Sequence, residues 1–154
     1  LGMQMAVIEY ARNVKKLRYA NSTEISEKCK DPVIDLMTSQ KEIINMGGTM
    51  RLGAWDCELS KNTIAHKVYK KKLISERHRH RYEFNNKYLK KIFDDKFIIA
   101  GLNPDTKLVE IIENRDHPWF VGVQFHPEYK SSVYNPHPIF VNFVKASLKK
   151  YLNK

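Results

Sequence analysis

The sequence predicts an α/β fold in which helices flank a layered sheet. Amphipathic helical patterns lie near both ends of the chain, and short apolar runs separated by turn residues lie between them. The residues with the clearest chemical potential, His126 and Glu128, directly follow one of these runs. In layered α/β proteins, sites form where strands end. We therefore expect the functional site at the carboxyl edge of the sheet.

The first part of the chain combines one helix, two strand candidates and a glycine-bearing loop. Apolar residues recur at near-helical spacing over residues 5–17, which predicts an amphipathic helix entered from Leu1 and Gly2. Residues 33–37 are a short strand candidate. The stretch 38–53 is polar and then rich in glycine, so it predicts a mobile loop that leads into a strand ending at Leu59.

The second part alternates short helices with strands. Helical turns are expected over 64–69 and 86–93, with an extended segment over 73–82 between them. Turn residues separate three further strands, expected at 97–102, 108–112 and 119–125. Pro138 begins the last helix. The buried face of that helix is expected to consist of Ile139, Phe140, Phe143, Val144 and Leu148.

Composition is that of one compact domain. The 154 residues suffice for a single core, and the hydrophobic share of 42% is ordinary for a globular protein. No apolar run approaches the roughly 20 residues of a membrane span, and no signal-peptide pattern is present, so no membrane partner is expected. Cys29 and Cys57 lack CxxC spacing, which fits two small buried thiols in a reducing cytoplasm.

The chain is basic, with a net charge of +10 from 27 basic and 17 acidic residues. Such a charge can attract nucleic acid or nucleotide phosphates. However, the lysines are spread in small groups along the chain, as on an ordinary solvated surface. Neither an RNP-type motif nor a zinc finger is present. We therefore expect no nucleic-acid partner.

The run 120–128 ends an apolar segment abruptly in His126-Pro127-Glu128. Residues two apart in a strand point to the same side, and the proline ends the strand and stiffens the turn. An imidazole held by a carboxylate on one nitrogen can serve a thiol or hydroxyl nucleophile with the other. The alternative is an ordinary surface loop. The continuous apolar strand before His126 favours the catalytic interpretation.

Two further patterns accompany this dyad. Leu1-Gly2 before a helix matches the downstream half of a nucleophile elbow, although any glycine before a helix gives the same pattern. Residues 77–81 read Arg-His-Arg-His-Arg, so a strand would carry three arginines on one face and His78 and His80 on the other. Arginine side chains bind carboxylates and phosphates well, but a solvated edge strand would show the same alternating pattern. No third ligand accompanies the histidines, so no metal site is expected.

In this order, these segments resemble the C-terminal glutaminase domain of CTP synthase, a class I glutamine amidotransferase. The resemblance covers essentially the whole chain, 1–154, and implies a layered, flavodoxin-like α/β domain without its N-terminal part. The stretches 47–53 and 76–83 resemble CTP synthases in particular, and argue against other amidotransferases and γ-glutamyl hydrolases. The matching stretches are residues 1–4, 9–12, 21–24, 47–53, 76–83, 108–113, 117–120 and 124–128.

The resemblance implies catalytic roles for the dyad. In this family a cysteine thiolate attacks the side-chain amide of glutamine and gives a glutamyl thioester. His126 would be the general base and then the acid for the departing ammonia. Glu128 would orient His126 and stabilise its imidazolium. Leu1 would give its backbone N–H to the oxyanion hole.

The resemblance also implies a binding site for L-glutamine. Gly2 and Met3 would line the pocket by close backbone approach, and Gln4 would hold the substrate. By charge complementarity, Arg81 suits the α-carboxylate of glutamine and Glu24 its α-ammonium group.

Further partners are implied for the intact family enzyme. Ammonia passes to a synthetase domain, where UTP activated by ATP is aminated to CTP with Mg²⁺, and GTP is an allosteric activator. The chain itself is expected to hold no cofactor. Residues 38–52 would correspond to a lid that GTP helps to order, and this loop is short here. The resemblance also implies a cytoplasmic homotetramer.

The sequence departs from the family at its start. The family's catalytic cysteine directly precedes the Leu-Gly-Met-Gln stretch, so its position lies before Leu1. We expect a fragment without the nucleophile, the upstream oxyanion loop and the synthetase domain, and therefore without activity of its own. Cys29 and Cys57 are not expected to replace the nucleophile. The alternative is a pseudo-glutaminase with a regulatory or binding role, and the residues upstream of Leu1 distinguish the two.

Overall fold

The computed structural model describes residues 1–36 and 50–153. It contains two sheets, with strand orders β1-β2-β5 and β4-β3-β6-β7-β8. The β1-β2 pair is parallel, and the other strand pairs in the described ranges are antiparallel. The strands are β1 (Ala20–Ser22), β2 (Asp31–Leu36), β3 (Arg51–Leu59), β4 (Leu73–His80), β5 (Tyr82–Phe84), β6 (Phe97–Leu102), β7 (Val109–Asn114) and β8 (Val121–Val123).

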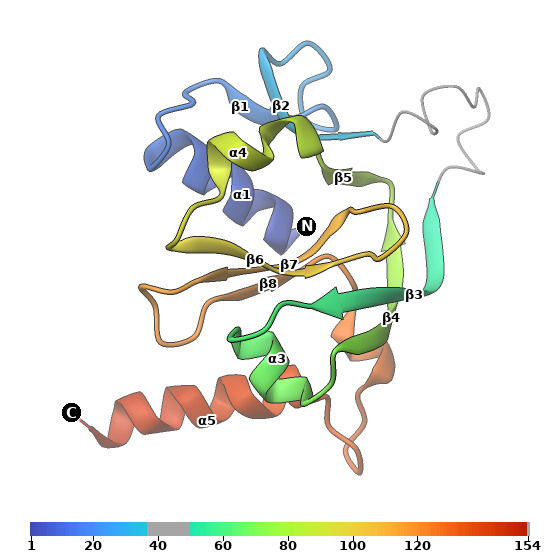
Figure 1. Ribbon diagram of the computed structural model, residues 1–154, viewed down its shortest axis with the longest axis vertical. Coiled ribbons are helices and arrows are strands. Elements are labelled where there is room, and N and C mark those ends of the chain that lie inside the picture. The colour runs from blue at the N-terminus through green and yellow to red at the C-terminus, as the bar shows by residue number, and fades with distance from the viewer. Residues whose placement is uncertain (37–49, 154) are drawn as a thin grey trace.

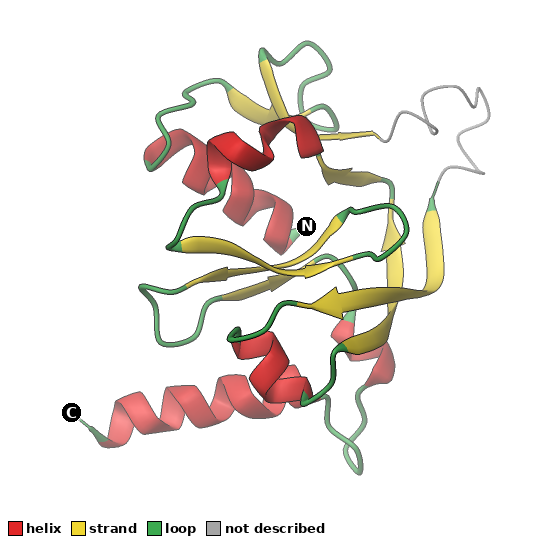
Figure 2. Ribbon diagram, viewed as in Figure 1, coloured by secondary structure: helices red, strands yellow, loops and turns green. Residues whose placement is uncertain are grey.

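Helices cover both faces of the five-stranded sheet (Figures 1 and 2). Helices α1 and α4 lie on one side together with the three-stranded sheet, and α3 and α5 lie on the other side. None of the helices in the described ranges is long and apolar enough to cross a membrane. The helices are α1 (Gly2–Asn13), α3 (Ile64–Tyr69), α4 (Leu89–Ile92) and α5 (Pro138–Leu152), with 3₁₀ turns η2 (Asn86–Tyr88) and η3 (Pro127–Lys130).

The core has two halves, one on each face of the sheet. Strand β7 contributes to both, because Ile111 and Ile112 are neighbours in a strand and point to opposite faces. Ile112 packs with α1, α4 and the small sheet, whereas Ile111 packs with residues of β3, α3 and α5. This two-sided burial explains why two isoleucines stand side by side in the strand, where a sheet with one solvated face would show alternation. The layered α/β class predicted from the sequence is confirmed.

Helix α1 differs from the prediction in its bounds and its buried face. It begins at Gly2 and ends at Asn13, and Lys16 follows in the left-handed region with a φ of 61°. Such a residue cannot continue a right-handed helix. Met5 and Val14, expected to be apolar contacts, are 41% and 54% exposed. The buried face consists of Met3, Gln4, Val7, Ile8 and Ala11.

Several strand predictions are confirmed and others need correction. The extended segment 73–82 contains β4, and the strand at 97–102 is β6. Strand β8 covers only Val121–Val123 of the expected 119–125. Strand β3 already begins at Arg51, so 51–53 are strand and not loop. Residues 38–49 of the predicted loop lie outside the described residues, which resume at residue 50.

The expected buried face of α5 is wrong for four of its five residues. Ile139 is buried, at 7% exposure, and packs in the core. Helix α5 contacts α3 near its start and then extends beyond the sheet (Figure 1). Its apolar stripe is therefore longer than the described surface on which it packs. The exposed members are Phe140, Phe143, Val144 and Leu148.

Candidate active site

The His126–Glu128 pair forms a short hydrogen bond just after β8. Nδ1 of His126 lies 2.6 Å from Oε1 of Glu128. The expectation that strand alternation aligns the two side chains is wrong, because His126 precedes η3 and Glu128 lies within it. Pro127 occupies the first turn of η3, where its fixed φ suits the helical turn. A tight turn thus brings the two side chains together.

The protonation of the dyad follows from its hydrogen bond. Partial burial is the largest single influence and acts to raise the pKa of Glu128. The hydrogen bond with His126, a backbone hydrogen bond and nearby positive charge together outweigh it, so the pKa lies below its ordinary value. The ionised carboxylate accepts the proton of Nδ1. This leaves Nε2 as the ring nitrogen that can accept a proton, as general base catalysis requires.

The backbone and ring of His126 are both fixed. Its N–H donates to the carbonyl oxygen of Arg77 in β4 over 2.8 Å. Its ring stacks on Tyr129, with 5.1 Å between centroids and 21° between planes. The side chain remains 32% exposed, so a reacting group can reach it.

A cavity of about 570 Å³ connects His126 with the start of the chain. Its wall includes Leu1, Gly2 and Met3, so the structure brings these three predicted residues to the same cavity as His126. At Gly122 of β8, a Cβ would lie 2.8 Å from Cγ1 of Ile112 and 3.5 Å from Cα of Met3. A glycine there leaves room for the side chain of Ile112 between β8 and α1. The remaining lining residues are Ala6, Trp119, Phe120, Val121, Val123, Gln124, Phe125 and Phe143.

The amino end of α1 opens toward this cavity. The first amide groups of a helix lack partners within the helix and carry partial positive charge. Leu1 is the N-cap residue of the 12-residue α1 and provides no side-chain cap. An anion next to Leu1 is therefore favoured electrostatically.

The other predicted substrate contacts, Gln4, Glu24 and Arg81, do not line this cavity. Gln4 is buried, and its Nε2 donates to the carbonyl oxygen of Tyr82 over 2.9 Å. Arg81 directly precedes that tyrosine, and its Nε has no hydrogen-bond partner among the described residues. Glu24 is exposed in the turn after β1, where its N–H donates to Oγ of Ser22. Gln4 and Arg81 are thus neighbours through Tyr82, whereas Glu24 lies apart from them in the chain.

Neither cysteine of the chain lines the cavity of His126. Cys57 is fully buried in β3, and burial raises the pKa of its thiol strongly. Cys29 is half-buried, and burial raises its pKa as well. A thiol with a raised pKa is a poor nucleophile at neutral pH. The interpretation as a buried thiol is confirmed for Cys57 and holds only partly for Cys29.

Strand β4 shows the predicted alternation over residues 77–80, but Arg81 follows the end of the strand and is half-buried, so the prediction of three arginines on one face is wrong for Arg81. Arg77 and Arg79 are exposed, whereas His78 is 2% exposed and lies on the inner face. β4 is an edge strand, as the alternative interpretation of its charges supposed. Arg77 and Arg79 line a second cavity of about 460 Å³, together with Leu52, Gly53, His78 and Tyr129.

The inner face of β4 joins a closed ring of buried charged and polar groups, which sequence reasoning missed. Arg51 bridges Glu83 at 3.1 Å and Glu110 at 2.5 Å. Nε2 of His78 lies 3.6 Å from Glu110, and Nδ1 of His80 lies 3.3 Å from Glu83. The two imidazoles are 2.7 Å apart, between Nδ1 of His78 and Nε2 of His80. We call these five residues the Arg51 ring.

Burial dominates the electrostatics of the Arg51 ring. It lowers the pKa of His78 to about 2 and of His80 to about 3, with the Arg51 charge acting in the same direction. Burial raises the pKa of Glu83 to about 8 and also raises that of Glu110, against the attraction of Arg51. Both histidines are therefore neutral at pH 7. The signal that could have revealed this ring is Glu110, an acid placed between apolar residues of a strand.

The described residues contain no group of three or more histidine, cysteine, aspartate or glutamate side chains suited to a metal ion. The ring histidines bind each other instead, and their other nitrogens, Nε2 of His78 and Nδ1 of His80, lie near the two glutamates without a hydrogen bond among the described residues.

Comparisons with known proteins agree with this geometry. Residues 1–146 match the family described as glutamine amidotransferase class-I. A CTP synthase of Christiangramia forsetii is 65% identical over 147 residues, 96% of this chain and 27% of the relative. A CTP synthase of Cytophaga hutchinsonii is 63% identical over 147 residues, which are again 96% of this chain and 27% of the relative. The chain thus spans about a quarter of the length of these curated relatives.

Among solved structures, the chain resembles the glutaminase domain of the Trypanosoma brucei CTP synthase with bound acivicin. The TM-score is 0.88 at 37% identity, and the match covers 96% of this chain and 58% of that one. Fold, dyad and family match therefore agree, and the chain belongs to the class-I glutamine amidotransferases.

Proposed function

We propose that the chain is the C-terminal glutaminase part of a CTP synthase. The longer protein would hydrolyse glutamine and use the ammonia for the ATP-dependent amination of UTP to CTP. The observation that carries the proposal is the hydrogen-bonded His126–Glu128 dyad on the same cavity as Leu1, Gly2 and Met3. The high identity to CTP synthases over 96% of the chain supports this choice among amidotransferases.

The proposed reaction uses a cysteine directly before Leu1. Nε2 of His126 takes the thiol proton, and the sulfur attacks the side-chain amide carbon of glutamine. The carbon–nitrogen bond then breaks, and His126 returns the proton to the leaving ammonia, which leaves a glutamyl thioester. Water activated by His126 hydrolyses the thioester to glutamate. Glu128 keeps the ring oriented and balances the charge of the imidazolium.

The start of α1 would stabilise the negative charge of this reaction. The attacking thiolate and the tetrahedral oxyanion both form next to Leu1, at the positive end of the helix. The backbone N–H of Leu1 would donate to the oxyanion when Leu1 is part of a longer chain. Gly2 and Met3 would line the pocket by backbone approach.

Gln4, Glu24 and Arg81 remain the proposed contacts for L-glutamine. The hydrogen bond of Gln4 to the carbonyl of Tyr82 supports a shared site with the adjacent Arg81. The unpaired Nε of Arg81 supports a role for its guanidinium in binding a carboxylate. Nothing comparable supports Glu24, which is exposed.

The remaining partners belong to the longer protein. ATP, UTP and Mg²⁺ would act in its synthetase domain, and no residue of this chain is assigned to them. GTP would act as the activator through the lid at 38–52, of which 38–49 lie outside the described residues. A homotetramer in the cytoplasm is part of the same proposal.

The polypeptide 1–154 by itself should not hydrolyse glutamine. His126 and Glu128 have no nucleophile to activate in it, because Cys29 and Cys57 lie away from their cavity. A purified 1–154 polypeptide whose glutamine turnover disappears with His126→Ala would contradict this expectation.

The proposal is tested with His126→Ala in the full-length protein. Glutamine-dependent CTP formation should fall at least about 10³-fold, because a lost triad member removes the base. CTP formation from added ammonia should remain, since the synthetase domain is unchanged. Undiminished glutamine-dependent synthesis in the variant would refute the role of His126. A wild-type protein that uses ammonia but not glutamine would favour a pseudo-glutaminase.

A further inference from the structure

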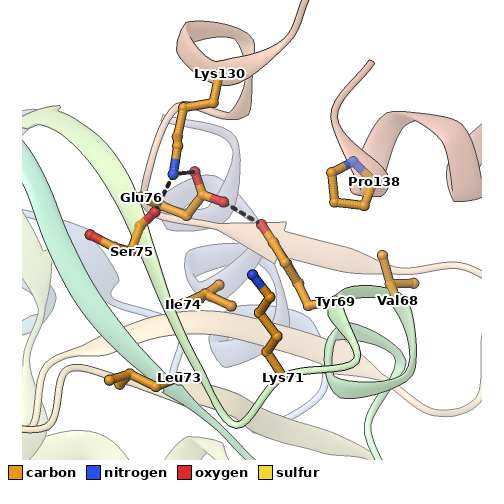
Figure 3. Close-up of a pocket in the computed structure, with 9 residues that line it drawn as sticks. All are labelled: Val68, Tyr69, Lys71, Leu73, Ile74, Ser75, Glu76, Lys130 and Pro138. Atoms are coloured by element: carbon orange, nitrogen blue, oxygen red, sulfur yellow. Dashed lines mark hydrogen bonds and ion pairs between the residues drawn. The ribbon is translucent and has the colours of Figure 1, made fainter. Parts of the chain in front are cut away.

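The segment that follows the dyad is anchored on a buried carboxylate of β4. Glu76 is 3% exposed, although it lies on an edge strand, because the alternation of β4 directs it inward. It lines a cavity of about 420 Å³ between α3, β4, η3 and the start of α5 (Figure 3). Tyr69, Lys71, Lys130 and Pro138 contribute to the same cavity.

Three side chains from three other elements converge on Glu76. The hydroxyl of Tyr69 in α3 donates to Oε1 over 2.9 Å, and Nε2 of His137 lies 3.0 Å from the same oxygen. Nζ of Lys130 in η3 lies 3.8 Å from Oε2 and donates to the carbonyl of Ser75 over 2.5 Å. Figure 3 shows Tyr69 and Lys130 reaching the carboxylate from opposite sides. We call Tyr69, Glu76, Lys130 and His137 the Glu76 cluster.

The hydrogen-bond directions in the Glu76 cluster are mutually consistent. His137 is the N-cap of α5, and its Nδ1 accepts the N–H of Ile139 over 3.3 Å. The proton of the neutral ring then resides on Nε2, which donates to Glu76. Burial raises the pKa of Tyr69, so its hydroxyl keeps the proton that it donates. Oε1 thus accepts two hydrogen bonds from fixed directions, which apolar packing could not impose.

The dyad lies between two anchors on β4. At one end, the N–H of His126 donates to the carbonyl of Arg77. At the other end, Lys130 binds Ser75 and Glu76. Glu128 lies between these anchors in η3 and is 55% exposed. Since solvent surrounds this carboxylate, its position on His126 depends on how firmly the turn is held.

We propose that Lys130 and Glu76 are positioning residues for glutamine hydrolysis. They hold η3 on β4 so that the carboxylate of Glu128 stays within hydrogen-bond distance of Nδ1 of His126. The inference rests on the proposed function for its catalytic consequence. The anchoring itself is a property of the fold.

The test is Lys130→Met in the full-length protein. This side chain is 45% exposed, so its loss should leave the fold intact. The kcat for glutamine hydrolysis should fall roughly 10- to 100-fold, because small displacements of catalytic groups have effects of this size. The KM for glutamine and ammonia-dependent CTP formation should stay within about twofold of wild type, since neither depends on the orientation of His126.

Two further variants sharpen the test. Lys130→Arg should recover most of the kcat, because a guanidinium can reach both Ser75 and Glu76. Lys71→Met is the matched control, because Lys71 lines the same cavity without a hydrogen bond or ion pair among the described residues. It should behave as wild type. Glu76→Gln keeps the shape of the side chain without its charge and should lower kcat as Lys130→Met does.

Hydrogen exchange provides a readout that does not depend on activity. Amides of residues 126–137 should exchange faster in Lys130→Met than in wild type or Lys71→Met. Unchanged exchange, or a full kcat in Lys130→Met, would overturn the proposal, as would an equal loss in both lysine variants. A wild-type protein without glutamine hydrolysis would refute the proposed function separately, and the exchange rates would still decide whether Lys130 anchors the segment.

Discussion

The dyad and the Arg51 ring both pair histidine with glutamate, yet they differ in what their imidazoles can do. In the dyad, Glu128 occupies one nitrogen of His126, and the ring is 32% exposed beside a cavity. In the Arg51 ring, His78 and His80 contact each other through one nitrogen each. Their other two nitrogens face the buried side chains of Glu110 and Glu83. The same residue types thus leave an imidazole nitrogen beside a cavity in one place and give a buried pair of imidazoles in the other. The accessibility of a ring nitrogen is what separates them.

Among the tests of this comparison, substitution of Arg51 has the largest expected effect. Arg51→Ala leaves the buried carboxyl groups of Glu83 and Glu110 without the charged donor that binds both, which should destabilise the fold by about 3–5 kcal/mol. Chemical denaturation of the domain measures this loss. Lys72→Met, which removes the exposed ion pair with Glu58, is the control and should leave stability unchanged. Equal stability of both variants would show that the Arg51 ring is not structural.

The pH dependence of stability is a second test of the comparison, and its expected effect is smaller than that of Arg51→Ala. The pKa of Glu83 is raised from 4.5 to about 8 in the folded state. The folded chain therefore keeps a proton that the unfolded chain releases. This contribution to stability is present below pH 4.5 and is lost as pH rises toward 8, by up to about 1.4 kcal/mol per pH unit.

Glu83→Gln should remove this alkaline loss. Thermal unfolding of wild type should show falling stability between pH 6.5 and 8, and the variant should show a flatter profile there. Below pH 6.5 the two buried histidines act in the opposite sense, because their lowered pKa values favour proton uptake by the unfolded chain. An identical alkaline slope in wild type and variant would contradict the assignment to Glu83.

Local sequence patterns predicted those features that local physics determines. The alternation of β4 follows from the period of a strand and could be read directly. The closeness of His126 and Glu128 was predicted, but for the wrong reason, because a turn and not strand alternation brings them together. The class-I amidotransferase family, expected from the motifs, is confirmed by the family match over residues 1–146. The catalytic roles of His126 and Glu128 stay predictions, as do the binding roles of Leu1, Gly2, Met3, Gln4, Glu24 and Arg81.

Features that depend on strand register could not be predicted from the sequence. The Arg51 ring joins β3, β4, β5 and β7, and the pairing of Arg51 with His80 cannot be read from periodicity. The Glu76 cluster likewise combines residues up to 68 positions apart. The error at α5 has another cause, since an amphipathic stripe shows that a helix has a partner but not where that partner lies.

The most direct test identifies the nucleophile that the dyad serves. The full-length protein is treated with an electrophilic glutamine analogue, and the modified residue is mapped by mass spectrometry. We expect one adduct on a cysteine directly before Leu1, and its formation should slow strongly in His126→Ala. An adduct on Cys29 or Cys57, or labelling that is independent of His126, would contradict the account.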